Sequence, residues 1–418
     1  MNKSATQVRT LDVDILSAKR LNIIISIFSL TFIIEFGIGL LYGQGHSFDI
    51  FSDFISTLIV SKNPYSFVGF GRGYFPFVFL FLWPFSLFSL QAALLISLML
   101  FIIFFYISSY LFLGNNFSRL ASTLALCSFS YVFIFLLDRA NVETFVYIFI
   151  AMFMLLYLKP NKSMFLDIIT AIFISFAINF KLYPGVFIIL MLRDKRFRCL
   201  AFTILFSGIV FIISMKAVGG TLDGLLQNLS WFNDNYQKAV FEIVAPQNTH
   251  SLFDSIKSIT LLITKDVDVT KAIILKFIGP YVLLVLILFT FIAAYVILYE
   301  KSKWRAVFLL TVAMVLFPYT SNDYTLIHMY IPLFMYIISK KDNGKLDYIF
   351  SVLFAIIFCQ LSFFELIKNF NWYLGMLIRP FAILTIMLII IIQGLKKNKF
   401  KDFKRKLMFY MHENQDYI

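Results

Sequence analysis

Long apolar stretches constrain this chain more than any other feature. Stretches of about 20 apolar residues recur from residue 22 to residue 394, which is the length that a helix needs to span a bilayer. The composition agrees, because 60% of the residues are hydrophobic and 14% are charged, whereas soluble domains have roughly 25% charged residues. We therefore predict an all-α, polytopic transmembrane helical bundle with about 12–13 apolar segments.

The basic residues indicate how the bundle is oriented. Lys and Arg concentrate in the short connectors 193–198, 300–305 and 340–345 and in the tail 396–406. This is the positive-inside pattern, so we expect these segments and both termini in the cytoplasm, with the protein in the cell membrane. The net charge of +13 is thereby explained without a nucleic-acid partner.

The same reasoning divides the chain into parts. We expect a cytoplasmic N-terminal segment over 1–20, a transmembrane domain over 21–395 and a basic cytoplasmic tail over 396–418. The polar loops 43–74 and 218–270 then lie outside. The second of these has six acidic residues and three lysines, as an outer loop should under the positive-inside rule.

The topology counted from the two ends conflicts between residues 75 and 118. An odd number of crossings cannot join two cytoplasmic termini, so one apolar segment must cross only partly. The segment 75–90 is the candidate, because it is interrupted by Pro84. Proline breaks a helix, and short broken helices line cavities in membrane proteins.

Four polar residues stand together between two uncharged apolar runs, in the sequence 138-DRANVE-143. Ionisable residues cost about 2.5–3.5 kcal/mol each at membrane depth and often mark a functional site. The alternative is a solvated turn between two spanning helices. The basic connectors place this turn outside, on the same face as Asp49, Asp53 and Lys181. That shared face favours a functional role for Asp138, Arg139, Asn141 and Glu143.

The first outer loop carries two carboxylates. Apolar residues at helical spacing over 48–59 predict an amphipathic helix on the outer membrane surface. Asp49 and Asp53 are four residues apart and share one face of it. Repulsion between them would raise the proton affinity of one, which suits a general base. The simpler interpretation is the polar face of an interfacial helix.

Three other residues each have a functional and a structural interpretation. Arg72 can bind a phosphate or flank a glycine-rich turn. Lys181 can bind a phosphate or extend to the interface as an anchor. His328 can contact a phosphate or shuttle a proton, or it can be a core histidine. Aromatic residues interleaved with Asn and Asp in 228–236 suit either sugar binding or an interfacial belt.

Several chemistries find no support in the sequence. There is no Walker loop, dinucleotide fingerprint, nucleophile elbow or HExxH motif, so a nucleotide-driven intracellular reaction is unsupported. The three cysteines lie far apart, and no metal-ligand cluster stands out. We therefore predict neither a metal nor a cofactor.

Several short motifs follow one another along the chain. They are the acidic first outer loop, Asn63-Pro64-Tyr65, Tyr74-Phe75-Pro76, 138-DRANVE-143, Lys181-Leu182-Tyr183-Pro184 and Asn248-Thr249-His250-Ser251-Leu252. Together these pieces resemble glycosyltransferase family 87 of the GT-C superfamily, whose members use polyprenyl-phosphate sugars. The resemblance covers most of residues 20–395. The chain departs from the family pattern where Phe77 replaces a second proline and where His328 alone represents a Trp-x-His-His-like element.

The resemblance implies transfer of a mannose-type hexose from a polyprenyl-phosphate donor to a lipid-linked or cell-envelope glycan acceptor at the outer face. It implies inversion, with Asp49 or Asp53 as the catalytic base. Cationic side chains would hold the departing phosphate, and other polar groups would orient the sugar. The substrate-binding candidates are Arg72, Asp138, Arg139, Asn141, Glu143, Lys181, Tyr183, Asn248, Ser251 and His328.

Two other classes stay open at this point. A polysaccharide polymerase or ligase also has many spans and a large outer loop, but arginines in that loop would favour it and 218–270 contains none. A transporter or flippase of lipid-linked sugars often shows internal repeats and broken helices near the midplane. Here no repeat is visible, and the polar groups gather at one face.

Overall fold

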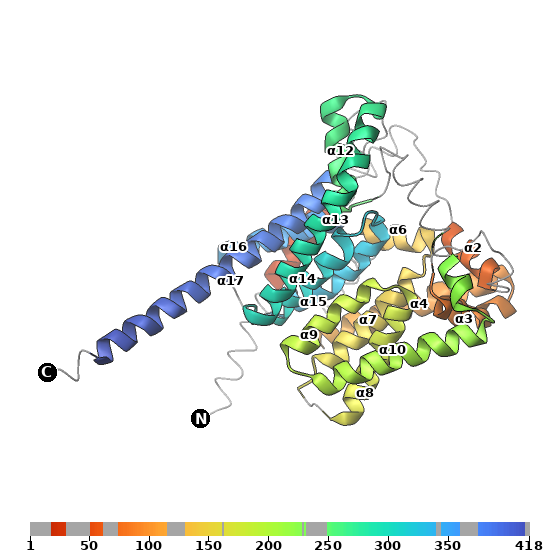
Figure 1. Ribbon diagram of the computed structural model, residues 1–418, viewed down its shortest axis with the longest axis horizontal. Coiled ribbons are helices and arrows are strands. Elements are labelled where there is room, and N and C mark those ends of the chain that lie inside the picture. The colour runs from red at the N-terminus through yellow and green to blue at the C-terminus, as the bar shows by residue number, and fades with distance from the viewer. Residues whose placement is uncertain are drawn as a thin grey trace.

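The computed structural model of the protein describes residues 18–30, 51–61, 74–114, 130–160, 163–227, 230, 249–339, 344–359 and 375–413 (Figure 1). Within these ranges every regular element is a helix, apart from one isolated antiparallel bridge between Thr249 and Asn322. The predicted all-α bundle is confirmed.

The elements follow one another in two groups along the chain. The first group, which follows a helical stretch over 18–30, is α2 (Ser52–Ser61), α3 (Pro76–Leu82), η1 (Trp83–Leu87), α4 (Leu90–Leu113), α6 (Tyr131–Arg139), α7 (Glu143–Tyr157), α8 (Met164–Phe180), η2 (Tyr183–Phe187), α9 (Ile188–Arg193) and α10 (Phe197–Ala217). The second group is α12 (Leu252–Thr264), α13 (Val267–Leu298), α14 (Lys303–Leu316), η3 (Asp323–Met329), α15 (Tyr330–Ile337), α16 (Gly344–Phe358) and α17 (Gly375–Glu413).

Four of the described helices are long and apolar enough to cross a membrane. They are Leu90–Leu113, Phe197–Ala217, Val267–Leu298 and Met376–Lys396. The exposed side chains of α10 and α13 are mostly Ile, Leu, Val and Phe, as lipid-facing surfaces require. Shorter apolar helices pack beside the four long ones.

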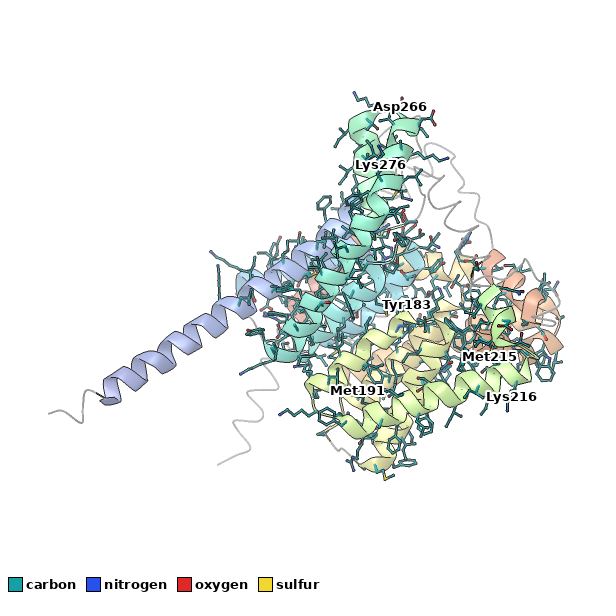
Figure 2. All side chains as sticks on the ribbon, in the orientation of Figure 1. Tyr183, Met191, Met215, Lys216, Asp266 and Lys276 are labelled. Carbon is teal, nitrogen blue, oxygen red and sulfur yellow. The ribbon has the colours of Figure 1, made fainter. Side chains whose placement is uncertain are left out.

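Helix α13 is longer than a bilayer is thick. Its 32 residues correspond to about 48 Å, against a hydrocarbon core of about 30 Å. One end must therefore lie outside the hydrocarbon. Its first half carries Asp268, Lys271 and Lys276 and pairs with α12, and both elements stand apart from the bundle at the top of Figure 1. Asp266 and Lys276 mark this polar end in Figure 2.

The Pro-interrupted segment is short, as the sequence predicts. Pro76 begins α3, and Pro84 lies in the 3₁₀ turn η1 that follows it. The 12 residues Pro76–Leu87 cover less than about 20 Å, which is too little to cross a bilayer. Phe81 packs with Phe145 of α7 and Phe180 of α8, at ring-centroid distances of 4.9 and 5.1 Å, so aromatic contacts hold the short helix in the bundle.

The elements α14, η3 and α15 form the centre of the core. Every side chain of Trp304–Leu316 is buried, and so is every one of Asp323–Ile337. Helices α4, α7, α16 and α17 pack around them. Helix α15 contacts α4, η3 contacts α7, and α14 contacts α17. Aromatic rings of α15 also pack against rings of α4 and α16. A polar residue in these central elements must therefore find its partner inside the protein.

The structure adds detail to two ranges that the sequence predicts to be outer loops. In the first, helix α2 contacts α3, η1, α4 and α6. Its Phe54 and Leu58 are buried, while Ile59 is 56% exposed, so protein covers part of the apolar face of this helix. The second range, 218–270, contains α12 and the first turn of α13.

Candidate active site

The turn 138–143 has a defined local conformation. Helix α6 ends at Arg139, and Ala140 follows in the left-handed region with φ 45°. The side-chain Oδ1 of Asn141 accepts a hydrogen bond from the backbone N–H of Glu143 at 3.1 Å, as asparagine commonly does in turns. This arrangement aims Arg139 and Asn141 to one side and buries Glu143 at the start of α7.

Arg139 and Asn141 both bind Asp53 of α2. Arg139 Nε and Nη2 donate to the two carboxylate oxygens at 3.2 Å each, and Asn141 Nδ2 donates at 2.9 Å. A guanidinium that binds both oxygens of a carboxylate holds it in a defined plane. The side chains of Asp53 and Arg139 stay 17% and 26% exposed, so this pair is reachable from outside the bundle. The Asp138 carbonyl accepts from the Phe51 N–H at 2.7 Å, which ties α2 to the same turn.

Glu143 forms the buried half of the site. Its carboxylate accepts hydrogen bonds from Lys181 Nζ, Tyr183 Oη and His328 Nε2, the last at 2.9 Å. Because an ionised carboxylate only accepts, the proton in the His328 contact is on Nε2. The other ring nitrogen, Nδ1, is buried and has no hydrogen-bond partner among the described residues.

Lys181 lies between Glu143 and three aromatic rings. Its ammonium is 5.8 Å from the ring centroids of Tyr74 and Tyr183 and 5.9 Å from that of Tyr324. Burial acts to lower the pKa of this amine, but the Glu143 carboxylate outweighs it and raises the pKa above its usual value. Lys181 therefore stays charged, and its side chain is 19% exposed.

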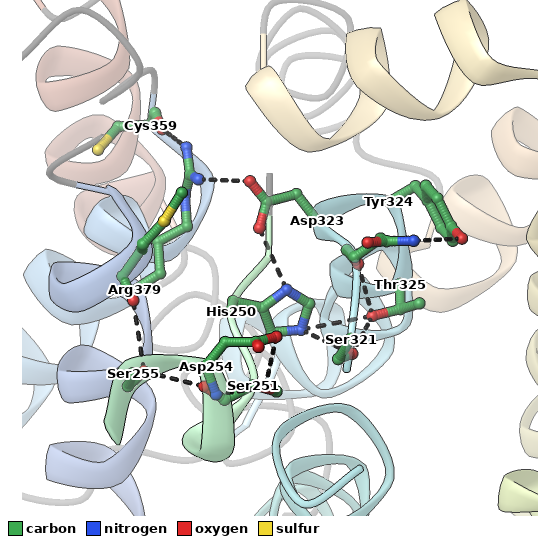
Figure 3. Close-up of polar contacts among 12 residues, drawn as sticks. His250, Ser251, Asp254, Ser255, Ser321, Asp323, Tyr324, Thr325, Cys359 and Arg379 are labelled. Atoms are coloured by element: carbon green, nitrogen blue, oxygen red, sulfur yellow. Dashed lines mark hydrogen bonds and ion pairs between the residues drawn. The ribbon is translucent and has the colours of Figure 1, made fainter. Parts of the chain in front are cut away.

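A second polar cluster surrounds the first turn of η3 (Figure 3). Asp323 accepts from His250 Nδ1 at 3.2 Å and from Arg379 Nη1 at 2.9 Å. Burial opposes ionisation of Asp323, but the charge of Arg379 and the contact with His250 hold the pKa of this carboxyl below its usual value. Beside them, Ser251 caps α12 by accepting from the Asp254 N–H at 2.9 Å.

The structure thus brings together most of the residues singled out in the sequence. Asp53, Arg139, Asn141, Glu143, Lys181, Tyr183 and His328 form one continuous network, to which Asp138 contributes its backbone carbonyl. Ser251 belongs to the second cluster. Asp49, Arg72 and Asn248 lie outside the described residues.

Sequence reasoning did not single out His250, Asp323, Arg379 or Tyr324 as site residues. One signal pointed to Arg379, because an arginine within an apolar span needs an anionic partner. Nothing local in the sequence identifies that partner. In the described part of the chain, no group of three or more His, Cys, Asp or Glu side chains is placed to hold a metal ion.

The fold and the site define an integral-membrane helical protein with a charged, partly exposed network formed by four separate segments. The model of glycosyltransferase family 87 matches residues 73–320, which is more than half of the 418 residues. The chain belongs to glycosyltransferase family 87, and it is a membrane glycosyltransferase. Comparison with curated proteins and with solved structures gave no match.

The matched range includes the turn 138–143 together with Tyr74, Lys181 and Tyr183. Asp53 precedes it and His328 follows it. Both reach the network through contacts of the tertiary structure, Asp53 with Arg139 and His328 with Glu143. Membership of the family assigns glycosyl transfer to the protein in place of the transport alternative.

Proposed function

We propose that this glycosyltransferase moves a mannose-type hexose from a polyprenyl-phosphate donor to a lipid-linked or cell-envelope glycan acceptor. The reaction takes place at the outer face of the cell membrane, with both termini in the cytoplasm. The main support is the Asp53 carboxylate, which is partly exposed and is held by Arg139 and Asn141 within one network with Lys181.

Asp53 is the described candidate for the base, and Asp49 is the alternative. The base takes the proton from the acceptor hydroxyl, and the acceptor oxygen attacks the anomeric carbon. The bond from that carbon to the phosphate oxygen breaks, and its electron pair leaves with the polyprenyl phosphate. A direct displacement of this kind inverts the anomeric centre and passes through a transition state with oxocarbenium character. A base must be within hydrogen-bond reach of the hydroxyl, which the exposed edge of Asp53 permits.

Arg139 and Lys181 bind the departing phosphate, with Arg72 as a third cation. Each of the two described cations is paired with a carboxylate, Arg139 with Asp53 and Lys181 with Glu143. The phosphate competes with Asp53 for Arg139, so binding of the donor weakens the contact between Arg139 and the base. Preorganised cations of this kind stabilise the negative charge that develops on the leaving group.

The remaining candidates support this arrangement. Glu143 is fully buried, so we assign it the task of holding Lys181, Tyr183 and His328 in place. Asn141 orients Asp53. Asp138 and Asn248 are candidates for contacts with the sugar or the acceptor, and Ser251 positions the start of α12.

Membranes that contain the protein, supplied with radiolabelled polyprenyl-phosphate mannose or glucose, test the proposal. We expect transfer of label from one of these donors to a glycan or lipid acceptor. Asp53→Asn should abolish transfer if Asp53 is the base, and Asp49→Asn should abolish it if Asp49 is. The matched control is Asp268→Asn, which removes an exposed carboxylate from the first turn of α13. Full activity in both Asp49→Asn and Asp53→Asn would exclude the base assignment.

A further inference from the structure

The 3₁₀ helix η3 connects the two polar clusters. Asp323, its first residue, accepts from His250 and Arg379, and His328, near its end, donates to Glu143. The two side chains are five residues apart, which corresponds to about 10 Å along a 3₁₀ helix. A shift of η3 at one end therefore moves the group at the other.

The contacts at the first turn of η3 come from several distant segments. The His250 ring lies between Asp323 and the hydroxyls of Ser321 and Thr325, with Nε2 at 3.2 and 3.4 Å from their oxygens. The Nδ1 atom carries the proton, because the carboxylate of Asp323 only accepts. Arg379 of α17 donates to Asp323 and also to the Cys359 carbonyl at the end of α16, at 3.1 Å. All three charged or titratable side chains of this group are buried (Figure 3).

A row of aromatic rings makes a second connection between the clusters. The Arg379 guanidinium lies 4.2 Å from the ring centroid of Tyr131. The rings of Tyr131 and Phe135 are stacked at 5.5 Å, and those of Phe135 and Tyr324 at 6.1 Å. The Tyr324 ring in turn faces Lys181. The two ends of this row are the cations of the two clusters.

The conformation of η3 depends on these external contacts. It has seven residues, whereas 3₁₀ runs longer than 3–4 residues are uncommon because their hydrogen-bond geometry is poorer than that of an α-helix. Asn322 at its N-cap makes no side-chain capping bond. Interactions with other parts of the protein must then stabilise η3, and the buried ionic contacts of Asp323 at its first turn are charge-assisted hydrogen bonds of the strong kind.

We propose that Asp323, held by His250 and Arg379, is a positioning residue that sets the placement of η3 and thereby of His328 against Glu143 and Lys181. This inference rests on the proposed function, because it assigns Asp323 to the same active site. Asp323 acts through η3 and does not touch the donor.

A double-mutant cycle tests the coupling. Asp323→Asn should lower kcat for transfer about tenfold or more and change KM for the donor less than about twofold, because binding by Arg139 and Lys181 is kept. In a His328→Ala background the same change should have little further effect, since the group that Asp323 positions is already gone. If Asp323→Asn does not fold, His250→Phe replaces it, because it keeps a ring but donates no hydrogen bond.

The chain supplies a matched control for general destabilisation. Asp167 and Arg196 form another buried ion pair, which joins α8 to the start of α10; its hydrogen bonds and ion pairs within the described residues do not involve η3. Asp167→Asn should act independently of His328→Ala, so that the two effects on kcat multiply.

A second readout separates this proposal from the proposed function. The thermal unfolding midpoints of the wild type, the two single variants and the double variant are measured in detergent, where no donor is needed. Non-additive shifts of the midpoint support the coupling. The coupling is overturned if the midpoint shifts of Asp323→Asn and His328→Ala add. It is also overturned if their effects on kcat multiply, as is expected for Asp167→Asn with His328→Ala. A wild type that transfers no label overturns the proposed function, and the unfolding cycle still decides the coupling.

Discussion

Removal of the Glu143 carboxylate is expected to destabilise the protein strongly. This carboxylate is fully buried and accepts from Lys181, Tyr183 and His328. In Glu143→Ala the Lys181 ammonium loses its counter-ion, and two further donors lose their acceptor. Breaking a buried ion pair by removing one partner costs about 3–5 kcal/mol. Because Lys181 keeps some exposure and water can reach it, we expect about 3 kcal/mol, at the lower end.

Two further variants refine this expectation. Glu143→Gln keeps the shape of the side chain and one acceptor oxygen, so its cost should be smaller, about 1–3 kcal/mol for a lost charge-assisted bond. Glu143→Gln combined with Lys181→Met removes both charges and should cost less than the sum of the two single changes.

Unfolding of the purified protein in detergent, followed by heat or denaturant, measures these differences. The wild type, the three single variants Glu143→Ala, Glu143→Gln and Lys181→Met, and the double variant are compared at one pH and one detergent concentration, with Asp268→Asn as the surface control. A Glu143→Ala variant within about 0.5 kcal/mol of the wild type, the range of an ordinary surface substitution, would refute the buried network as a source of stability. Equal losses for Glu143→Gln and Glu143→Ala would refute the role of the remaining acceptor oxygen.

Three more outcomes follow from the structure. A Cβ on Gly394 would lie 1.8 Å from the Tyr295 hydroxyl oxygen, so Gly394→Ala should lower the free energy of unfolding by about 1–3 kcal/mol through overpacking. In the control Gly208→Ala the added Cβ meets nothing within 4 Å, so the free energy of unfolding should not fall. The pKa of Asp323 is lowered in the folded state. Its contribution to stability is therefore present above the unfolded pKa of about 3.9 and is lost as the pH falls through the folded value. The difference in unfolding midpoint between the wild type and Asp323→Asn should shrink below about pH 4, and a constant difference would contradict this. Arg139→Lys keeps the charge but loses the bidentate contact with the Asp53 carboxylate, so transfer in the radiolabel assay should fall about tenfold. Unchanged transfer would show that the charge alone is sufficient.

Much of the site could be anticipated from the sequence, though not its connections. The turn 138–143, Lys181 and His328 were singled out because polar residues between apolar runs are costly unless they have a role. Asp53 was singled out because it shares one face of a predicted helix with Asp49. The sequence left Lys181 equally open to phosphate binding and to interfacial anchoring. Its pairing with Glu143 emerges only in the fold, because the two residues are on α7 and at the end of α8 and meet through helix packing.

The first outer loop shows the same limit. Helical spacing over 48–59 correctly indicated a helix, which the structure describes over Ser52–Ser61. The pattern shows only that one face is apolar, and lipid and protein satisfy an apolar face equally well. Contacts with α3, η1 and α6 bury part of that face, and they place Asp53 against Arg139.

By itself the sequence determined that this protein is a helical membrane protein, and it indicated which residues gather toward one face. The length of apolar runs and the placement of Lys and Arg are local properties, and the bilayer acts on them directly. Only the tertiary structure decided which carboxylate meets which cation. Asp323 and Arg379 are 56 residues apart, and Glu143 and His328 are 185 apart. Such pairs form because a charge removed from water must find a partner within hydrogen-bond reach, and helix packing determines which partner that is.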